Sequence, residues 1–260
     1  MEAGFRTPLL DMFRRGEVSR DVKMLAARGA LAPRPHEQLT LLVELVDDPE
    51  LEIRLAAEET LQEIPREALE AFLARSDTSP TLREFFAARG IQAGAVPAVN
   101  AEEPLIDRGE VVEEPAAEAQ SEDKQGALKR LAAMTVSDRV KAAMKGSREE
   151  RAILIRDPNK LVSVAVLSSP KVNESEIENY AKMANVSDEV LRIIGNTRAW
   201  VKNYGIVSAL ARNPKTPVAI ALNLVQRLND RDLKMIATDR NAQEPLKVAV
   251  RKRISQGKDQ

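Results

Sequence analysis

The sequence contains no cysteine and a single histidine, His36, among its 260 residues. Disulfide bonds, thiolate catalysis and zinc sites built on cysteine or on several histidines are therefore excluded. Aromatic residues make up only 3% of the chain, so alanine, leucine, valine and isoleucine must fill the core. Because small and aliphatic side chains suit helix-on-helix packing better than a β-sandwich, we expect an all-α protein.

Long apolar runs are also missing. No stretch approaches the roughly 18 uninterrupted apolar residues that a membrane-spanning helix needs. The first residues, Met1-Glu2-Ala3, are acidic, and no apolar segment of a secretory signal follows them. We expect a protein without a membrane span that works in the reducing cytoplasm.

Signatures of catalysis are absent as well. The chain has no phosphate-binding loop, dinucleotide-binding fingerprint or nucleophile elbow. Paired carboxylates such as Glu149/Glu150 and Asp230/Asp232 fall at predicted helix starts, where they complement the helix dipole. We therefore expect no catalytic residue, no metal site and no cofactor, and a protein that binds its partner without turning it over.

Charge is distributed very unevenly along the chain. Residues 1–123 contain 13 basic and 26 acidic side chains, whereas residues 124–260 contain 26 basic and 14 acidic ones. The two halves thus carry net charges of −13 and +12, although the whole chain is close to neutral. An asymmetry of this size points to charged partners or to contact between the halves.

The two halves are separated by a stretch in which the helical pattern ends. Glycine and proline interrupt residues 93–123, and residues 100–123 hold nine acidic side chains against one basic one, Arg108. This composition predicts a disordered acidic linker. It divides the chain into an acidic helical domain over residues 1–92 and a basic helical-repeat domain over residues 124–256.

Self-similarity in the basic half predicts a repeat. Arg156, Arg198 and Arg240 stand 42 residues apart, each between two apolar helical patterns. The turn Ser169-Pro170-Lys171 returns as Asn213-Pro214-Lys215. A period near 40 residues built from helices is typical of an α-solenoid, in which neighbouring units bury one another's apolar faces.

One segment of the acidic half resembles the second helix of a HEAT repeat. The resemblance covers residues 36–64 and is carried by Asp48-Pro49, Ile53-Arg54, Ala56-Ala57 and Leu61. In that family the small residues let helices approach closely, and the aspartate and arginine tie successive turns together. The resemblance implies HEAT-like helical packing in this domain.

The basic half is similar to the leucine-rich-repeat-variant and related HEAT-like repeats of bacteria, including proteins of unknown function. Residues 210–217, with the sequence Leu-Ala-Arg-Asn-Pro-Lys-Thr-Pro, carry this likeness, and Asp239-Arg240-Asn241 carries it less well. The match covers residues 150–254. It differs in period, and it lacks the cysteines that precede the repeats in some members, so the resemblance implies a helical fold without an iron–sulfur cluster.

The residues most suited to binding a partner are the repeated arginines and the basic or aromatic side chains close to them. Each arginine could instead bind carbonyls or a neighbouring aspartate, Asp157 or Asp239. Trp200 lies one helical turn before Tyr204, as it would in a core stripe, although both types are also frequent binding anchors. The candidate interaction residues are Arg156, Arg198, Trp200, Lys202, Tyr204, Arg240, Arg251, Lys252 and Arg253.

Three functional hypotheses fit this pattern. The first is a scaffold or adaptor whose basic repeats receive an acidic protein surface or peptide. The second is a nucleic-acid-binding protein that uses the same basic face, although acidic residues are interspersed with the basic ones. In the third, the acidic linker over residues 100–123 contacts residues 124–256 and masks their binding surface.

Overall fold

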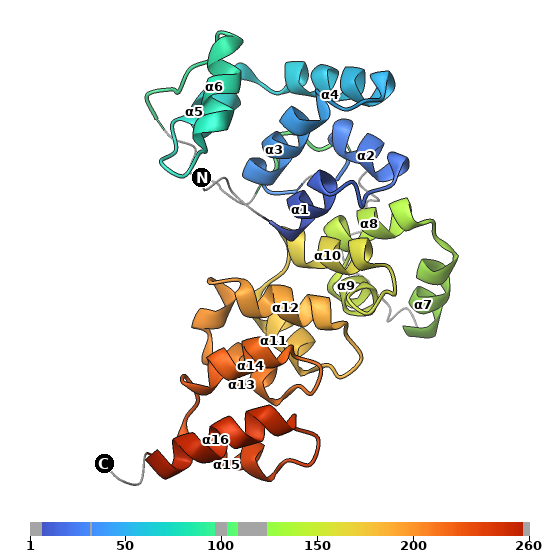
Figure 1. The fold of residues 1–260 in the computed structure, drawn as a ribbon. Coiled ribbons are helices and arrows are strands. Elements are labelled where there is room, and N and C mark those ends of the chain that lie inside the picture. Colours follow the sequence, from blue (N-terminus) through green and yellow to red (C-terminus); the bar gives the residue numbers. More distant parts are fainter. Residues whose placement is uncertain (1–6, 32, 97–102, 109–123, 257–260) are drawn as a thin grey trace, which may run out of the picture. The chain divides into compact units, whose positions relative to one another are not determined.

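The computed structural model describes residues 7–31, 33–96, 103–108 and 124–256. These residues form sixteen α-helices and one short 3-10 helix, and the described ranges contain no strand (Figure 1). The prediction of an all-α protein is therefore confirmed. None of the described helices combines the length and the apolar character that crossing a membrane requires.

The chain divides into two compact units. Unit 1 comprises residues 1–154 and 161–171, and unit 2 comprises residues 155–160 and 172–260. The helices of unit 1 are α1 (Pro8–Arg14), α2 (Arg20–Ala27), α3 (Pro35–Leu45), α4 (Leu51–Glu63), α5 (Arg66–Leu73), α6 (Pro80–Ala88), α7 (Lys124–Ala133), α8 (Val136–Lys145), α9 (Arg148–Leu154) and α10 (Lys160–Ser168).

In unit 2, five of the six α-helices are eight or nine residues long. The helices of this unit are α11 (Glu174–Lys182), α12 (Asp188–Asn196), the 3-10 helix η1 (Trp200–Lys202), α13 (Tyr204–Arg212), α14 (Val218–Val225), α15 (Asp230–Thr238) and α16 (Glu244–Gln256). The apolar residues that recur at helical spacing, such as Ile177, Ile206 and Ile236, are fully buried. Burial of this face stabilises helices too short to be stable alone.

The division into units differs from the predicted domain boundary at the linker. Helices α7 to α10 belong to unit 1, where α8 contacts α2. The apolar face of α8, with Val140, Ala143 and Met144, is buried, and α10 is buried from Leu161 to Ser168. Composition placed the boundary where the charge changes sign, but burial of apolar surface holds these helices against the acidic segment.

The net charges of the two units consequently differ less than the net charges of the two sequence halves. Unit 1 has 22 basic and 29 acidic side chains, and unit 2 has 17 and 11. The net charges are −7 and +6, about half of the contrast between the two sequence halves. The basic character of α7 to α10 is therefore balanced within unit 1.

Part of the predicted disordered linker has a defined place in unit 1. Residues 93–96 follow α6, and the amide of Gly94 donates to the carbonyl of Glu70 at 2.8 Å. Glu103–Arg108, here named the docked segment, contacts α3 and α4 and pairs Asp107 with Lys145 of α8. Disorder is thus a wrong prediction for these two stretches, because main-chain and ionic contacts hold them. Residues 97–102 and 109–123 lie outside the described residues.

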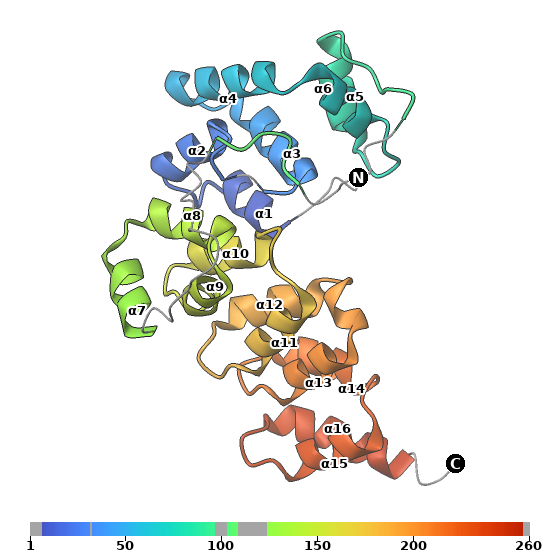
Figure 2. The same ribbon diagram turned by 180° about the vertical axis from the view of Figure 1, so that it is seen from behind.

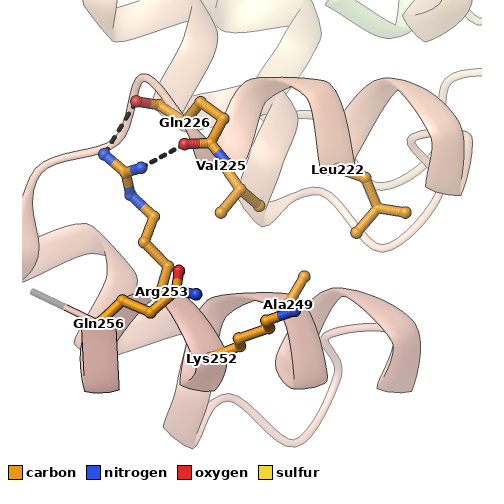
Figure 3. A pocket seen from close by; sticks show the side chains of 7 residues that line it. All are labelled: Leu222, Val225, Gln226, Ala249, Lys252, Arg253 and Gln256. Carbon is orange, nitrogen blue, oxygen red and sulfur yellow. Dashed lines mark hydrogen bonds between the residues drawn. The ribbon is translucent and has the colours of Figure 1, made fainter.

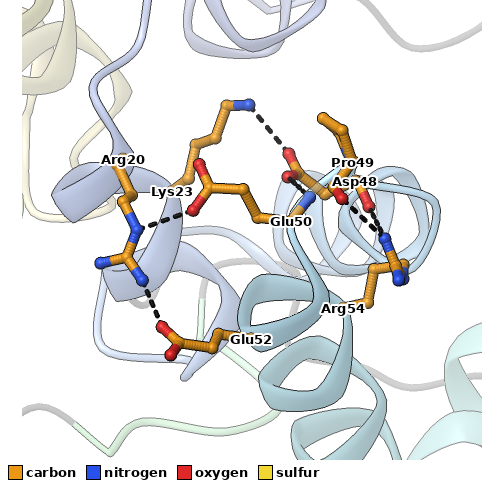
Figure 4. Close-up of polar contacts among 7 residues, drawn as sticks. All are labelled: Arg20, Lys23, Asp48, Pro49, Glu50, Glu52 and Arg54. Atoms are coloured by element: carbon orange, nitrogen blue, oxygen red, sulfur yellow. Dashed lines mark hydrogen bonds and ion pairs between the residues drawn. The ribbon is translucent and has the colours of Figure 1, made fainter.

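The HEAT-like segment forms a polar network at the start of α4 (Figure 4). Asp48 accepts from the amide of Glu50 at 3.0 Å and pairs with Lys23 of α2 at 2.8 Å. Arg54 donates to the carbonyls of Asp48, at 2.7 Å, and Pro49, at 2.9 Å. This aspartate and this arginine therefore fix the turn before α4 and tie it to α2.

The helices of unit 2 repeat with a period shorter than 42 residues. From α11 to α16, successive helices begin 12 to 16 residues apart. Helix α11 contacts α13, α12 contacts α14, and α14 contacts α16, so helices two apart in the chain are neighbours, as are consecutive helices such as α13 with α14 and α15 with α16. The 42-residue interval therefore spans three helices. When the sequence is compared with itself, it matches at any offset that equals a whole number of helices, because each helix repeats the same apolar spacing.

The two related proline turns make the same kinds of bonds. Ser169 accepts from the amide of Lys171 at 3.3 Å and donates to the carbonyl of Met144 at 2.7 Å. Asn213 accepts from the amide of Lys215 at 3.0 Å and donates to the carbonyl of Ala181 at 2.8 Å. Each turn is thus tied to a helix end 25 to 32 residues earlier.

Candidate functional site

Hydrogen bonds between helices that are two apart in the chain define two opposite edges of unit 2. On the first edge, the amide of Asn203 donates to Glu174 at the start of α11, at 2.9 Å. The hydroxyl of Tyr204 at the start of α13 donates to Asp232 in the first turn of α15. Arg253 near the end of α16 donates to the carbonyl of Gln226 after α14, at 3.0 Å. The starts of α11, α13 and α15 and the ends of α12, α14 and α16 therefore share this edge.

The second edge contains the other turns. Asn213, after α13, donates to the carbonyl of Met183, after α11, at 2.9 Å. Gln243, before α16, donates to the carbonyls of Pro214, at 2.7 Å, and Thr216, at 2.9 Å. The ends of α11, α13 and α15 thus lie together, away from the first edge.

This geometry separates the three repeated arginines. Arg198 follows α12 on the first edge, whereas Arg240 follows α15 on the second. Positions three helices apart face opposite edges because consecutive helices run in alternating directions. Arg156 is exposed in the turn between α9 and α10, outside the six helices that form the edges. The arginines therefore do not form a single row.

Asp157 and Asp239 make the same kind of hydrogen bond within their own turns. The carboxylate of Asp157 accepts from the amide of Asn159 at 2.8 Å, and that of Asp239 accepts from the amide of Asn241 at 2.8 Å. Both aspartates thus close their own turns. Arg198 and Arg240 are exposed and have no side-chain partner among the described residues.

Positive charge gathers on the first edge, which we name the basic edge. Five acidic residues occur there: Glu174, Glu176 and Glu178 of α11 and Asp230 and Asp232 of α15. Four of these carboxylates already accept hydrogen bonds within the fold, from Asn203, Tyr180, Lys182 and Tyr204. The seven basic residues of this edge are Arg198, Lys202, Arg227, Arg231, Arg251, Lys252 and Arg253.

Most of these cations are available to a ligand. Arg253 is bonded to Gln226, but the other six are exposed and have no side-chain partner within the described part of the chain. Arg227 and Arg231 were not among the candidates from the sequence. The sequence shows that both residues are basic and lie near a helix end. Only the packing of α14 and α15 shows that they share an edge with Arg198.

The two aromatic candidates have different surroundings. Trp200 is half-buried in η1, which contacts both α12 and α13. Tyr204 is 41% exposed, and its hydroxyl also accepts from the amide of Asn229 at 3.2 Å. Partial burial, followed by the bond to Asp232, raises the pKa of the Tyr204 hydroxyl above its usual value. Tyr204 therefore fixes α13 to the start of α15 and leaves part of its ring accessible.

A pocket of about 240 Å³ opens beside the basic edge, between α14 and α16 (Figure 3). The guanidinium of Arg253 lies at one end of it and bonds both the side chain and the main chain of Gln226. Its lining combines aliphatic and basic groups, from Leu222, Val225, Gln226, Ala249, Lys252, Arg253 and Gln256.

The described residues contain no group of three or more histidine, cysteine, aspartate or glutamate side chains placed to hold a metal ion. Comparison with protein-family models, with curated proteins and with solved structures finds no match to this chain. The basic edge is therefore interpreted from its own geometry.

Proposed function

We propose that unit 2 is a binding module that receives an acidic segment of another protein along its basic edge. The observation that carries this proposal is the excess of seven cations over five carboxylates on one edge, six of the cations without a side-chain partner among the described residues. Charges that a fold does not use internally attract and orient an oppositely charged partner. Action as a scaffold or adaptor in the cytoplasm is part of this proposal.

A short α-solenoid is the architecture that best explains this edge. Alternate helices contact one another, and the bonds between turns recur at separations of 25 to 32 residues. Stacked helix pairs place equivalent turns along one side, so charges in successive turns form an extended surface. Such a surface suits a peptide or an elongated acidic face of a partner.

Nucleic acid is the alternative ligand. Arg198 and Lys202 flank the half-buried Trp200, and Tyr204 follows with 41% of its surface exposed. Cations beside aromatic rings bind single strands by charge and by base stacking. Acidic residues on the same edge favour a protein partner, because they repel a continuous phosphate backbone.

The test compares two charge-matched variants of the full chain. The first combines Arg198→Ala with Lys202→Ala on the basic edge. The second combines Lys215→Ala with Arg240→Ala on the opposite edge. Binding of a fluorescein-labelled peptide of alternating glutamate and serine is followed by fluorescence polarisation, and a labelled single-stranded oligonucleotide is titrated in parallel.

We expect the basic-edge variant to bind the acidic peptide about tenfold more weakly, since each exposed charge contributes up to about 1 kcal/mol. The control variant should lose less than about twofold, although it loses the same charge. Equal losses in the two variants would show that only net charge matters and would refute a defined edge. Tighter binding of the oligonucleotide, with a steep decrease as salt is raised, would select the nucleic-acid alternative.

A further inference from the structure

A second binding site lies in unit 1, where the docked segment is held by its main chain. The side-chain oxygen of Gln38 accepts from the amides of Leu105, at 2.8 Å, and Ile106, at 3.2 Å. Its amide nitrogen donates to the carbonyl of Ile106 at 2.5 Å. A glutamine amide offers one acceptor and two donors, as a neighbouring β-strand would, so it recognises an extended backbone of any sequence.

The docked segment covers the side chain of Gln38. The side chain of Gln38 is only 2% exposed. Beneath the docked segment, the backbone of Leu105 and Ile106 matches the hydrogen-bonding groups of this amide, because a buried amide left without partners costs about 1–3 kcal/mol. The position is therefore built to accept a peptide backbone.

Side chains of the docked segment add selectivity. The side chain of Ile106 packs so close to Gly29 that a Cβ on this glycine would lie 3.2 Å from it. Arg108 pairs with Glu63 of α4, and its amide points to the carbonyl of Gly29 at 3.4 Å. Asp107 pairs with Lys145 of α8. The site thus selects an aliphatic residue, then an acidic one, then a basic one.

These contacts have the character of a ligand more than that of a core element. Glu103–Arg108 contains no helix, its apolar residues are half-buried, and Asp107 and Arg108 are exposed. The polar contacts of the segment include two exposed ion pairs, three hydrogen bonds to Gln38 and one to the carbonyl of Gly29, and exposed ion pairs add little to the intrinsic affinity of this interface. Its occupancy is favoured because the segment is tethered, which gives an effective concentration on the order of millimolar.

We propose that Gly29, Gln38, Glu63 and Lys145 form a peptide-binding site that the docked segment fills as an intramolecular ligand. The partner is an extended peptide of another protein with the pattern Leu-Ile-Asp-Arg, which binds by displacing residues 103–108. The segment therefore inhibits its own site until a tighter or more concentrated peptide competes with it.

The experiment uses the full chain and a labelled, end-capped peptide with the sequence of residues 103–108, Glu-Pro-Leu-Ile-Asp-Arg. In one variant, Ile106→Asp places a charge against Gly29 and Thr60 and releases the segment. In a second variant, residues 104–108 are replaced by glycine and serine at equal length. Circular dichroism and thermal unfolding confirm that each protein is folded, and fluorescence polarisation measures binding.

Either released variant should bind the peptide at least tenfold more tightly than the natural chain, in which the tethered segment competes. Adding Gln38→Ala should lower that affinity at least tenfold, and a peptide carrying the aspartate substitution should not bind. Arg198→Ala with Lys202→Ala, in unit 2, should leave this binding unchanged. Equal binding by natural and released chains, or no binding by folded released chains, would overturn the proposal. So would failure of both variants to fold, since a ligand is dispensable for folding.

Discussion

At the scale of single residues, Glu37 is a carboxylic acid in the core of unit 1. It is 1% exposed and accepts a hydrogen bond from the hydroxyl of Thr7, which also caps α1. Burial raises the pKa of Glu37 from 4.5 to about 7, although the bond from Thr7 acts in the opposite direction. The folded state therefore binds this proton more tightly than the unfolded chain does.

The sign of the resulting pH dependence follows from linkage. The contribution of neutral Glu37 is fully present below pH 4.5 and is lost as the pH rises towards about 7. We expect Glu37→Gln, which stays neutral, to stabilise unit 1 relative to the natural chain by about 2 kcal/mol more at pH 8 than at pH 5. Urea unfolding at both pH values measures this difference.

Glu59→Gln serves as the control, because it removes an exposed carboxylate of unit 1. Its effect should stay below about 0.5 kcal/mol at either pH. If the effect of Glu37→Gln were the same at pH 5 and pH 8, the proposed cause of the pKa shift would be wrong.

Alanine substitution at two glycines distinguishes the cost of a left-handed backbone from the cost of a steric clash. Gly16 and Gly29 each follow a helix with φ of +69°, but only Gly29 has neighbours within reach of an added Cβ, Ile106 at 3.2 Å and Thr60 at 3.3 Å. Both substitutions by alanine should cost about 1 kcal/mol for the left-handed conformation. Gly29→Ala should cost about 1 kcal/mol more, because the docked segment must move. Equal losses in urea unfolding would show that Ile106 is not held against Gly29.

At the scale of secondary-structure elements, side chains in the turns determine how the helices of unit 2 pack on one another. Asn213 is 7% exposed and bonds two carbonyls at the end of α11, those of Ala181 and Met183, as well as its own turn. Its truncation leaves buried carbonyls without donors. Turns of this kind hold a helix pair in register with the preceding pair.

We expect Asn213→Ala to lower the free energy of unfolding of unit 2 by about 1–3 kcal/mol. The matched control is Asn241→Ala, in the turn after α15, where the asparagine is exposed. It should cost less than about 0.5 kcal/mol. Amide exchange in α11 and α13, measured by mass spectrometry, checks the result, and unchanged protection there would contradict it.

At the scale of the whole molecule, the two compact units cross the boundary that composition suggests. Helix α8 follows the acidic linker in the chain but shares a core with α2. A destabilising substitution in α3 should therefore also destabilise α8, although α8 follows the linker in the sequence. Leu39 of α3 is completely buried and provides the test.

Leu39→Ala should destabilise unit 1 by about 2–5 kcal/mol. Hydrogen exchange should then increase throughout the unit, in α8 as well as in α2 to α4, since one cooperative unit opens together. Leu191→Ala in α12, also completely buried, is the counterpart in unit 2 and should leave α8 unchanged. Protection of α8 that persists in Leu39→Ala would restore the boundary at residues 93–123.

Local features were readable because they depend on neighbouring residues. Apolar spacing predicts the helices, and their starts depend on residues three apart, as in the cap from Ser187 to the amide of Val190 and the capping box of Ser147 with Glu150. The turn asparagine and proline residues also marked the helix ends. These elements require contacts within about one helical turn, so the sequence alone contains the information.

The candidate site depended on contacts that sequence spacing does not encode. Arg198 and Arg240 repeat in the sequence but lie on opposite edges, whereas Arg227 shares an edge with Arg198. Gln38 gave no sign of its role, because its partners Leu105 and Ile106 lie 67 and 68 residues away.

The sequence by itself determined the helices, their capped ends and the overall contrast of charge. Tertiary structure decided which helices share a core, which cations share an edge and where the docked segment lies. The physical reason is that helix formation is a short-range property of the chain. Burial of apolar faces, in contrast, joins segments by their shape and can bring together parts of the chain that composition separates.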